Sequence, residues 1–129
     1  MNPGDALEPQ TYAVTREDLV RYAAASGDQN PIHQAEDVAR SVGLPGVIAH
    51  GMFTLALAAR AVAAWSEGAE VVELGCKFTN PVVVPEGAGT EIVIAGTVKD
   101  AIDGLTTLAL EVTCGGQKVL GMPKAVVRG

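Results

Sequence analysis

Apolar and polar residues alternate with a period of two along most of the chain that follows Gly68. This period puts successive side chains on opposite faces of a strand, so it predicts a sheet with one buried face. The expected strands are residues 71–79, 91–99, 105–114 and 118–127. Asp103-Gly104 and Gly115-Gly116 have the composition of hairpin turns that need positive φ. Pro123 removes a ladder donor from the last strand, which predicts a bulge or a sheet edge there.

The half of the chain before Gly68 has a helical period instead. After a short strand at residues 11–14, helices are expected at residues 16–26, 36–42 and 50–66. Thr15 and Asp18 form a capping box at the start of the first helix, and Gly27 ends it. The last helix is apolar almost all round, which is typical of a helix buried on most faces. The pattern therefore predicts an α+β fold in one domain, residues 1–129, with a curved antiparallel sheet wrapped around one long central helix.

Composition narrows the possible partners. The chain has 129 residues, of which 48% are apolar, and this is enough for one hydrophobic core. A formal net charge of −6 without a basic cluster argues against a nucleic-acid partner. An acidic ligand would have to be met by scattered cations, of which the candidates are Arg21, Arg40, Arg60, Lys77 and Arg128.

The remaining composition points to a cytoplasmic protein. Cys76 and Cys114 lie far apart with no metal-like spacing, so we expect buried thiols in a reducing compartment and no metal or other cofactor. The longest apolar run, residues 52–65, is interrupted by Arg60 and is shorter than the roughly 20 residues of a membrane span. No signal peptide is visible in residues 1–9, and no membrane insertion is expected.

The candidate chemistry lies in residues 26–33, Ser-Gly-Asp-Gln-Asn-Pro-Ile-His. Pro31 keeps Asn30 out of helical dihedrals, so Asp28 and His33 share one tight loop and can turn to the same side. Gly51 follows downstream, where it can open the long apolar helix. A carboxylate, an imidazole and a helix-start amide are the groups needed for proton transfer beside a polarised carbonyl. Each residue alone also has an ordinary structural explanation as a turn former, a loop histidine or a helix-start glycine.

The complete set of motif residues favours the functional interpretation over the structural ones. Ser26-Gly27-Asp28-x-Asn30-Pro31-x-His33, followed by Ala49-His50-Gly51-Met52, resembles the signature of the MaoC-like hydratases and dehydratases, the (R)-specific enoyl hydratase family. The resemblance extends from Thr11 to Val127 and is greatest for the small actinobacterial dehydratase subunits of that family. It implies the hot-dog fold, a sheet around a central helix, which agrees with the patterning.

The resemblance also implies roles for the residues. Asp28 and His33 would be the catalytic dyad, and the backbone amide of Gly51 would stabilise the negative charge on the thioester oxygen. We expect Asn30 to hold the loop by bonding backbone near Asp28. Ser26 is interpreted as a helix-end hydroxyl and His50 as a structural histidine, both supporting the site.

One departure from the family pattern concerns the residues after the dyad histidine. Many relatives place an Asp there, whereas this chain has Gln34-Ala35-Glu36. We expect Glu36 to cap the short helix instead. Phe53 and Trp65 are expected in the core rather than in an acyl pocket.

The sequence is compatible with several functions. The first is a hydro-lyase that dehydrates (3R)-hydroxyacyl thioesters to trans-2-enoyl thioesters in fatty acid synthesis, long-chain and mycolic acids included. The same reaction in reverse would make it an (R)-specific enoyl-CoA hydratase of fatty acid degradation or polyester precursor supply. A different class is a tunnel-shaping subunit for a catalytic hot-dog partner, and a third is an acyl-thioesterase, whose motifs are not seen. The substrate carrier is either coenzyme A or acyl carrier protein. A free sheet edge predicts a homodimer or a heterodimer with a hot-dog paralogue.

Overall fold

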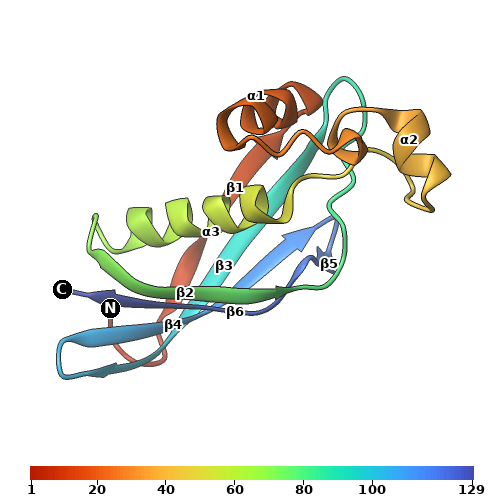
Figure 1. Cartoon of the computed structure of the whole chain (residues 1–129). Helices are drawn as coiled ribbons and strands as arrows, with labels where there is room; N and C mark the ends of the chain where they lie inside the picture. Colours follow the sequence, from red (N-terminus) through yellow and green to blue (C-terminus); the bar gives the residue numbers. More distant parts are fainter.

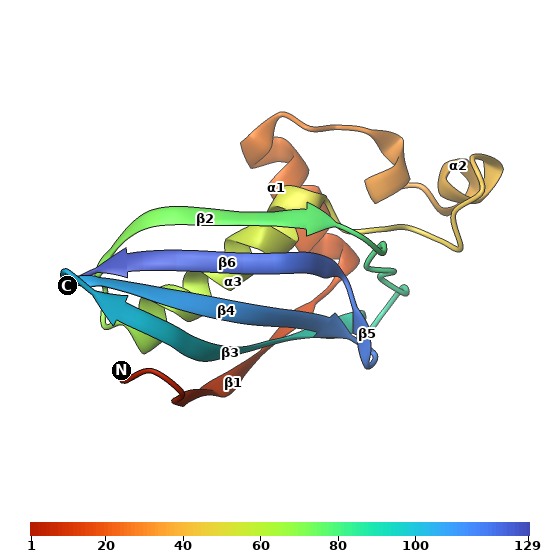
Figure 2. The same ribbon diagram turned by 90° about the horizontal axis from the view of Figure 1, so that it is seen from below.

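The alternating half of the chain, together with a strand from the N-terminal half, forms one antiparallel sheet in the computed structural model, which describes all 129 residues. Its strands are β1 (Ala6–Val14), β2 (Glu70–Phe78), β3 (Thr90–Ile102), β4 (Leu105–Cys114), β5 (Gln117–Lys118) and β6 (Leu120–Arg128). They lie in the order β1-β3-β4-β6-β2, and β5 pairs with β4. Figure 2 shows β1 and β2 at the two edges of this sheet. The four predicted strands are confirmed, with the last one divided into β5 and β6.

Turns and strand ends account for the differences from prediction. Asp103 and Gly104 have φ of 53° and 77°, so the expected hairpin is present. β1 begins five residues earlier than the short strand expected from residue 11, because it pairs with β3 as far back as Ala6↔Thr97. β6 pairs with β4 only over Lys124–Arg128, so Pro123 has no partner on β4 and lies at a local edge of the sheet, as predicted. A register shift of β6 against β2 and a φ of 44° at Met122 identify a bulge there.

The helices follow the order α1 (Arg16–Ser26), the 3₁₀ turn η1 (Pro31–His33), α2 (Glu36–Ser41) and α3 (Gly51–Trp65). Figure 1 shows α3 lying across one face of the sheet, with α1 and α2 beyond its N-terminal end. The predicted capping box at Thr15 and Asp18 is present, and Gly27 ends α1 with a φ of 80°. No helix has the length and hydrophobicity needed to span a bilayer.

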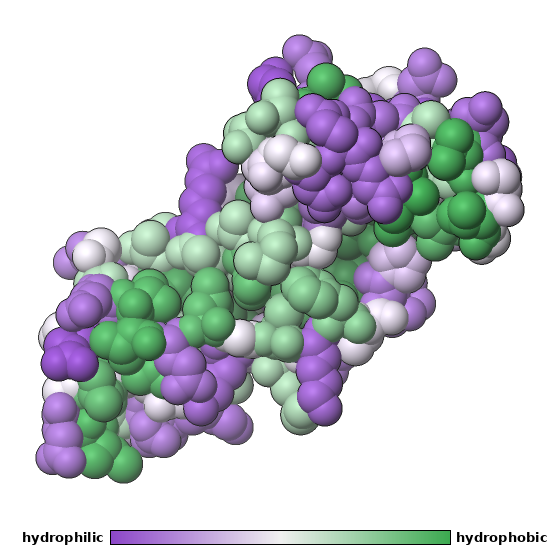
Figure 3. Space-filling view, viewed as in Figure 1, coloured by the Kyte–Doolittle hydropathy of each residue, from purple (hydrophilic) through white to green (hydrophobic).

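The expectation that α3 is buried on most faces is wrong for the single chain. Its buried residues, Thr54, Ala58, Ala61 and Val62, form the stripe that faces the sheet. Met52 at the start of the helix is 58% exposed, and Ala56, Ala63 and Ala64 are also exposed. Figure 3 shows hydrophobic residues reaching the surface over α3. Periodicity detects that a helix is apolar all round, but it does not show which of its faces the same chain covers.

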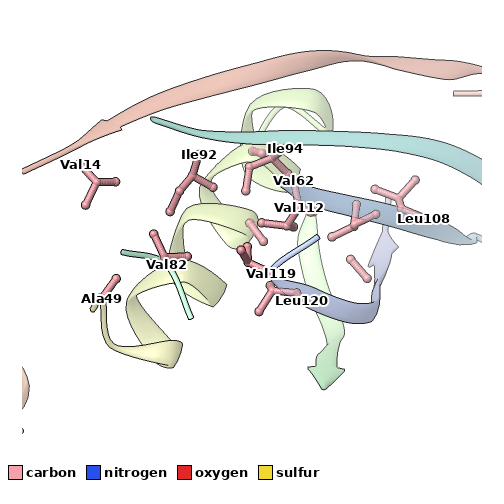
Figure 4. Close-up of a cluster of buried hydrophobic side chains, with 14 of the residues drawn as sticks. Val14, Ala49, Val62, Val82, Ile92, Ile94, Leu108, Val112, Val119 and Leu120 are labelled. Atoms are coloured by element: carbon pink, nitrogen blue, oxygen red, sulfur yellow. The ribbon is translucent and has the colours of Figure 1, made fainter. Parts of the chain in front are cut away.

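The core lies between α3 and the sheet. Ile92 and Ile94 of β3 and Leu108 of β4 are fully buried there, with Val62 of α3 opposite them (Figure 4). Phe53 and Trp65 are half-buried and pack against this cluster, as expected. The core therefore fixes α3 on the sheet and places the first turn of the helix beside the loops that carry the candidate chemistry.

An ion pair fastens those loops to the rest of the molecule. Arg16 donates to Glu36 at 2.8 Å and to the carbonyl of Val84 at 2.8 Å. The hydrogen bond from Arg16 is the main reason that the pKa of Glu36 lies below its usual value. Glu36 is the first residue of α2 and makes no side-chain cap, so its predicted capping role is wrong. Its partner stands 20 residues away, which local sequence reasoning does not reach.

Candidate active site

The loop of residues 26–33 is built from successive side-chain-to-backbone hydrogen bonds. Ser26 Oγ accepts from the amide of Asp28 at 3.2 Å, and Asp28 Oδ1 accepts from the amide of Asn30 at 3.3 Å. Asn30 Oδ1 then accepts from the amide of Ile32 at 3.2 Å, which caps η1. Asn30 holds the loop as expected, although its side chain bonds backbone at Ile32 rather than near Asp28. These short polar side chains replace backbone partners in a segment without regular structure.

His33 is held at both its ring edge and its ring face. It is 7% exposed, and its Nδ1 lies 2.7 Å from the carbonyl oxygen of Ile48. Because a carbonyl only accepts, Nδ1 carries the proton, and the neutral ring has its lone pair on Nε2. Its face stacks on His50 with ring centroids 3.8 Å apart. His33 therefore presents a proton acceptor from a fixed position.

His50 precedes α3 and is 2% exposed. Its Nε2 lies 3.1 Å from the carbonyl oxygen of Asp28, and its Nδ1 is buried without a hydrogen-bond partner. The edge of Tyr22 from α1 packs on the same ring, with centroids 4.8 Å apart. His50 thus has the structural contacts expected of it, and it touches both candidate dyad residues.

Asp28, His33 and His50 each offer one polar atom, and these three atoms lie within 4.8 Å of one another. That separation is suited to a shared water molecule, which bridges polar atoms over such distances. The two rings are inclined by only 23°, so their in-plane lone pairs point along nearly parallel planes. Metal–nitrogen bonds of about 2.0–2.1 Å need lone pairs that converge on one point. This arrangement fits proton transfer better than metal ligation.

Gly51 is the first residue of α3, so its amide has no acceptor within the helix. The positive end of the helix dipole adds to its value as a donor to a developing oxyanion. The ring of Phe78, which is 58% exposed, packs against it, and a Cβ on Gly51 would lie 2.8 Å from that ring. The close contact with Phe78 is therefore one reason why position 51 requires glycine. The sequence alone did not indicate this contact.

A cavity of about 590 Å³ opens over these groups. Of the predicted site residues, Ser26, Asp28, His50 and Gly51 line it, whereas His33 and Asn30 lie outside the lining. Among the lining residues that sequence reasoning missed are Tyr22, Phe78 and Asn80. Tyr22 stands four residues before Ser26 on α1, and this helical spacing is a signal that could have found it. Phe78 and Asn80 reach the cavity only through the path of β2 across the sheet.

The two cysteines take no part in this cavity. Both are free and half-buried, which is less burial than expected. Burial raises the pKa of the Cys76 thiol, and Cys114 Sγ lies 3.2 Å from Thr90 Oγ1. Burial of this kind suppresses the reactive thiolate form, so Cys76 is a packing thiol.

Comparison with known proteins decides the family. The model of the MaoC like domain matches residues 1–115. The chain belongs to the MaoC-like dehydratase family. A curated relative, 3-hydroxyacyl-thioester dehydratase X of Mycobacterium tuberculosis, is 41% identical over 76 residues, covering 59% of this chain and 26% of the relative. The mitochondrial 3-hydroxyacyl-[acyl-carrier-protein] dehydratase of Arabidopsis thaliana is 33% identical over 81 residues, covering 63% of this chain and 48% of the relative. The matched region thus spans about half or less of these relatives.

Several solved structures share the fold of this chain. A MaoC-like dehydratase superposes with a TM-score of 0.94 and 36% identity, over 99% of this chain and 40% of that one. The (R)-hydratase from A. caviae involved in PHA biosynthesis superposes with a TM-score of 0.87 at 21% identity, over 99% and 96% of the two chains. The HadBC (3R-hydroxyacyl-ACP dehydratase) complex from M. tuberculosis gives 0.75 at 19%, over 97% and 96%. These matches confirm the predicted hot-dog fold.

Proposed function

We propose that this MaoC-like chain catalyses the reversible dehydration of (3R)-hydroxyacyl thioesters to trans-2-enoyl thioesters. The observation that carries the proposal is the convergence of Asp28, His33 and His50 polar atoms within 4.8 Å, beside the free amide of Gly51. The names of the relatives, dehydratases of 3-hydroxyacyl thioesters and carrier-bound acids, support the same chemistry. In the hydration direction the proposed activity is that of an (R)-specific enoyl-CoA hydratase. The structural similarity to the A. caviae (R)-hydratase supports this direction.

The dyad of Asp28 and His33 would carry out the proton transfers of this reaction. In hydration, a water held between the carboxylate and His33 Nε2 gives a proton to the dyad while its oxygen bonds to C3. The π electrons of C2 and C3 move toward the thioester carbonyl, and the dyad then returns a proton to C2. No net proton is consumed, and dehydration runs the same steps in reverse. Each such transfer contributes about 10²–10⁴ in rate.

The amide of Gly51 would receive the thioester oxygen. Negative charge grows on that oxygen as C2 and C3 react, and a fixed donor at a helix N-terminus stabilises it without reorganisation. The ring of Phe78 packs against Gly51 within 2.8 Å of where a Cβ would lie, so it borders this position.

The direct test is hydration of a short trans-2-enoyl-CoA, followed by loss of the conjugated thioester's ultraviolet absorbance. Asp28→Asn removes the carboxylate with little change in shape, so we expect a rate at least about 10²-fold lower with an unchanged fold. Asp37→Asn is the matched control, because Asp37 is an exposed carboxylate of α2 outside the cavity. An unaffected rate in Asp28→Asn would refute the proposal.

The second candidate, a tunnel-shaping subunit of a larger assembly, is favoured by the surface of α3 and β2. β2 is a free sheet edge, and Val72 on it is 39% exposed. Such edges are usually paired or covered, and the mycobacterial HadBC structure is named as a complex. We propose that a second hot-dog unit, identical or paralogous, pairs with this edge and covers the outer face of α3. Light scattering of the wild type and of Val72→Lys tests the pairing, and an inactive wild type expressed alone would favour an obligate heterodimer.

The carrier is tested by comparing coenzyme A and acyl-carrier-protein substrates of increasing chain length. Arg21, Arg40 and Arg128 already face carboxylates, and Arg60 lies over the ring of Tyr12. Of the five candidate cations only Lys77 has no such partner, so we propose it as the contact for a phosphate of either carrier.

A further inference from the structure

His50 is tied to both residues of the proposed dyad by contacts of different kinds. Its ring stacks on His33, with centroids 3.8 Å apart and planes inclined by 23°. Its Nε2 lies 3.1 Å from the carbonyl oxygen of Asp28. No other side chain of the structure has a hydrogen bond or ring contact with both residues.

The hydrogen bonds fix the proton positions on both rings. A carbonyl oxygen only accepts, so His50 carries its proton on Nε2, as His33 carries its own on Nδ1. The lone pair of neutral His50 is then on Nδ1, which is buried with no partner. Buried polar atoms are nearly always paired, and an unpaired one in a stable fold calls for an explanation. A phenyl ring would fill the same space without that deficit, so packing alone does not account for histidine here.

We propose that His50 is a positioning residue, which holds the Asp28 carboxylate and His33 Nε2 toward the same water molecule. The inference rests on the proposed function of the dyad. Tyr22 supports the arrangement from the other side, with its ring edge on His50 at 4.8 Å and 60°.

Each of the two contacts of His50 restricts a specific motion of a dyad residue. His33 has one hydrogen bond, to Ile48, about which its ring would otherwise swing, and the stack on His50 blocks that rotation. Asp28 is exposed, and its other hydrogen bonds reach only two residues along the chain. The bond from His50 ties this loop to a position 22 residues away, at the start of α3. Because misplacement by about 1 Å can slow a reaction about 10²-fold, these two contacts bear directly on the rate.

Two substitutions separate the contacts. His50→Phe keeps a stacking ring and removes the donor, whereas His50→Gln keeps a donor and removes the ring. We expect each to lower kcat by about 10- to 100-fold with KM changed less than about twofold, because positioning acts on the reacting geometry rather than on binding. Phe53→Leu is the control, since the Phe53 ring contacts Tyr22 and lies outside the cavity lining. It should lower stability and leave kcat unchanged.

A spectroscopic measurement separates this inference from the proposed function. Nitrogen-15 NMR of the histidines should show one tautomer of His33 in the wild type and in His50→Phe, which keeps the stack, and a mixture of tautomers in His50→Gln, whether or not any substrate is turned over. That tautomer shift in a protein that hydrates no enoyl thioester, alone or with a hot-dog partner, would refute the proposed function alone. Unchanged kcat in both variants and an unchanged His33 tautomer in His50→Gln would refute the positioning role.

A double substitution distinguishes positioning from direct contact with substrate. His50→Gln removes the stack on His33, so it should have little further effect once His33 is Gln. His50→Phe removes the bond to the Asp28 carbonyl, so it should have little further effect once Asp28 is Asn. An equal fold-loss of each His50 variant in the wild-type and the substituted background would show that His50 acts on the substrate independently and would overturn the proposal.

Discussion

The core between α3 and the sheet and the segment of residues 26–33, here called the site loop, are held together by different kinds of interaction. The core depends on fully buried apolar residues such as Ile92, Ile94 and Leu108, whose attraction is non-directional. In the site loop most residues from Ser26 to Pro31 are exposed, and single hydrogen bonds fix the chain. Stability and proposed chemistry therefore rest on different interactions, and substitutions should affect one without the other.

The two regions meet at the N-terminus of α3. Ala58 and Ala61 are small enough to bring the helix close to the sheet, and both are fully buried. That packing fixes the position of Gly51, while His50 just before it reaches back to Asp28. The sheet thus supplies the reference frame in which the site loop is placed.

The largest effect is expected from His33→Gln. The glutamine can still donate to Ile48, but it removes the Nε2 acceptor. We expect kcat for enoyl-CoA hydration to fall about 10³-fold, equivalent to about 4 kcal/mol in the activation barrier. Urea unfolding should show a much smaller loss of stability. If the free energy of unfolding fell by as much as the activation barrier rose, the proposed separation of the two regions would be wrong.

Leu108→Ala should have the reverse signature. Leu108 is fully buried in β4, and removal of its side chain leaves a cavity in the core. The free energy of unfolding should fall by about 3 kcal/mol. At temperatures well below the melting point kcat should stay within about twofold of the wild type. A large loss of kcat in the folded variant would show that the core tunes the site as well as supporting it.

Gly51→Ala tests the boundary between the regions. The added Cβ would lie 2.8 Å from the Phe78 ring, which must move. We expect kcat to fall about tenfold, or about 1.4 kcal/mol, because the Cβ narrows the approach to the amide. The double variant Gly51→Ala with Phe78→Ala relieves the contact with the ring. Full recovery of kcat in that variant would assign the loss to Phe78 rather than to the thioester position.

The smallest effect is expected from Asp18→Asn in the capping box of α1. Hydrogen bonds, first from the backbone of Thr15, lower the pKa of Asp18 from 3.8, so the folded state favours its ionised form. Its contribution is present above pH 3.8 and is lost as pH falls through the lower folded-state value. At pH 7 the variant should lose about 1 kcal/mol of stability. Unfolding measured at pH 7 and near pH 3 should show this difference shrinking, with kcat at pH 7 unchanged.

Local signals in the sequence were sufficient for most elements. Alternation located β2, β3 and β4, and the capping box with Gly27 bounded α1 at its observed ends. Such signals depend on neighbours a few residues apart, so the chain alone contains them. The errors concern distant partners: Glu36 pairs with Arg16 instead of capping α2, and the outer face of α3 is not covered by its own chain.

The sequence by itself determined the element order, the hot-dog architecture expected from the family motif, and the loop that carries Asp28 and His33. Only the tertiary structure decided that His50 stacks on His33, that Phe78 lies over Gly51, and that Tyr22 and Asn80 line the same cavity. The physical reason is that strand and helix patterns follow from local periodicity. Contacts between residues far apart in the sequence depend instead on how the packed core orients the loops attached to it.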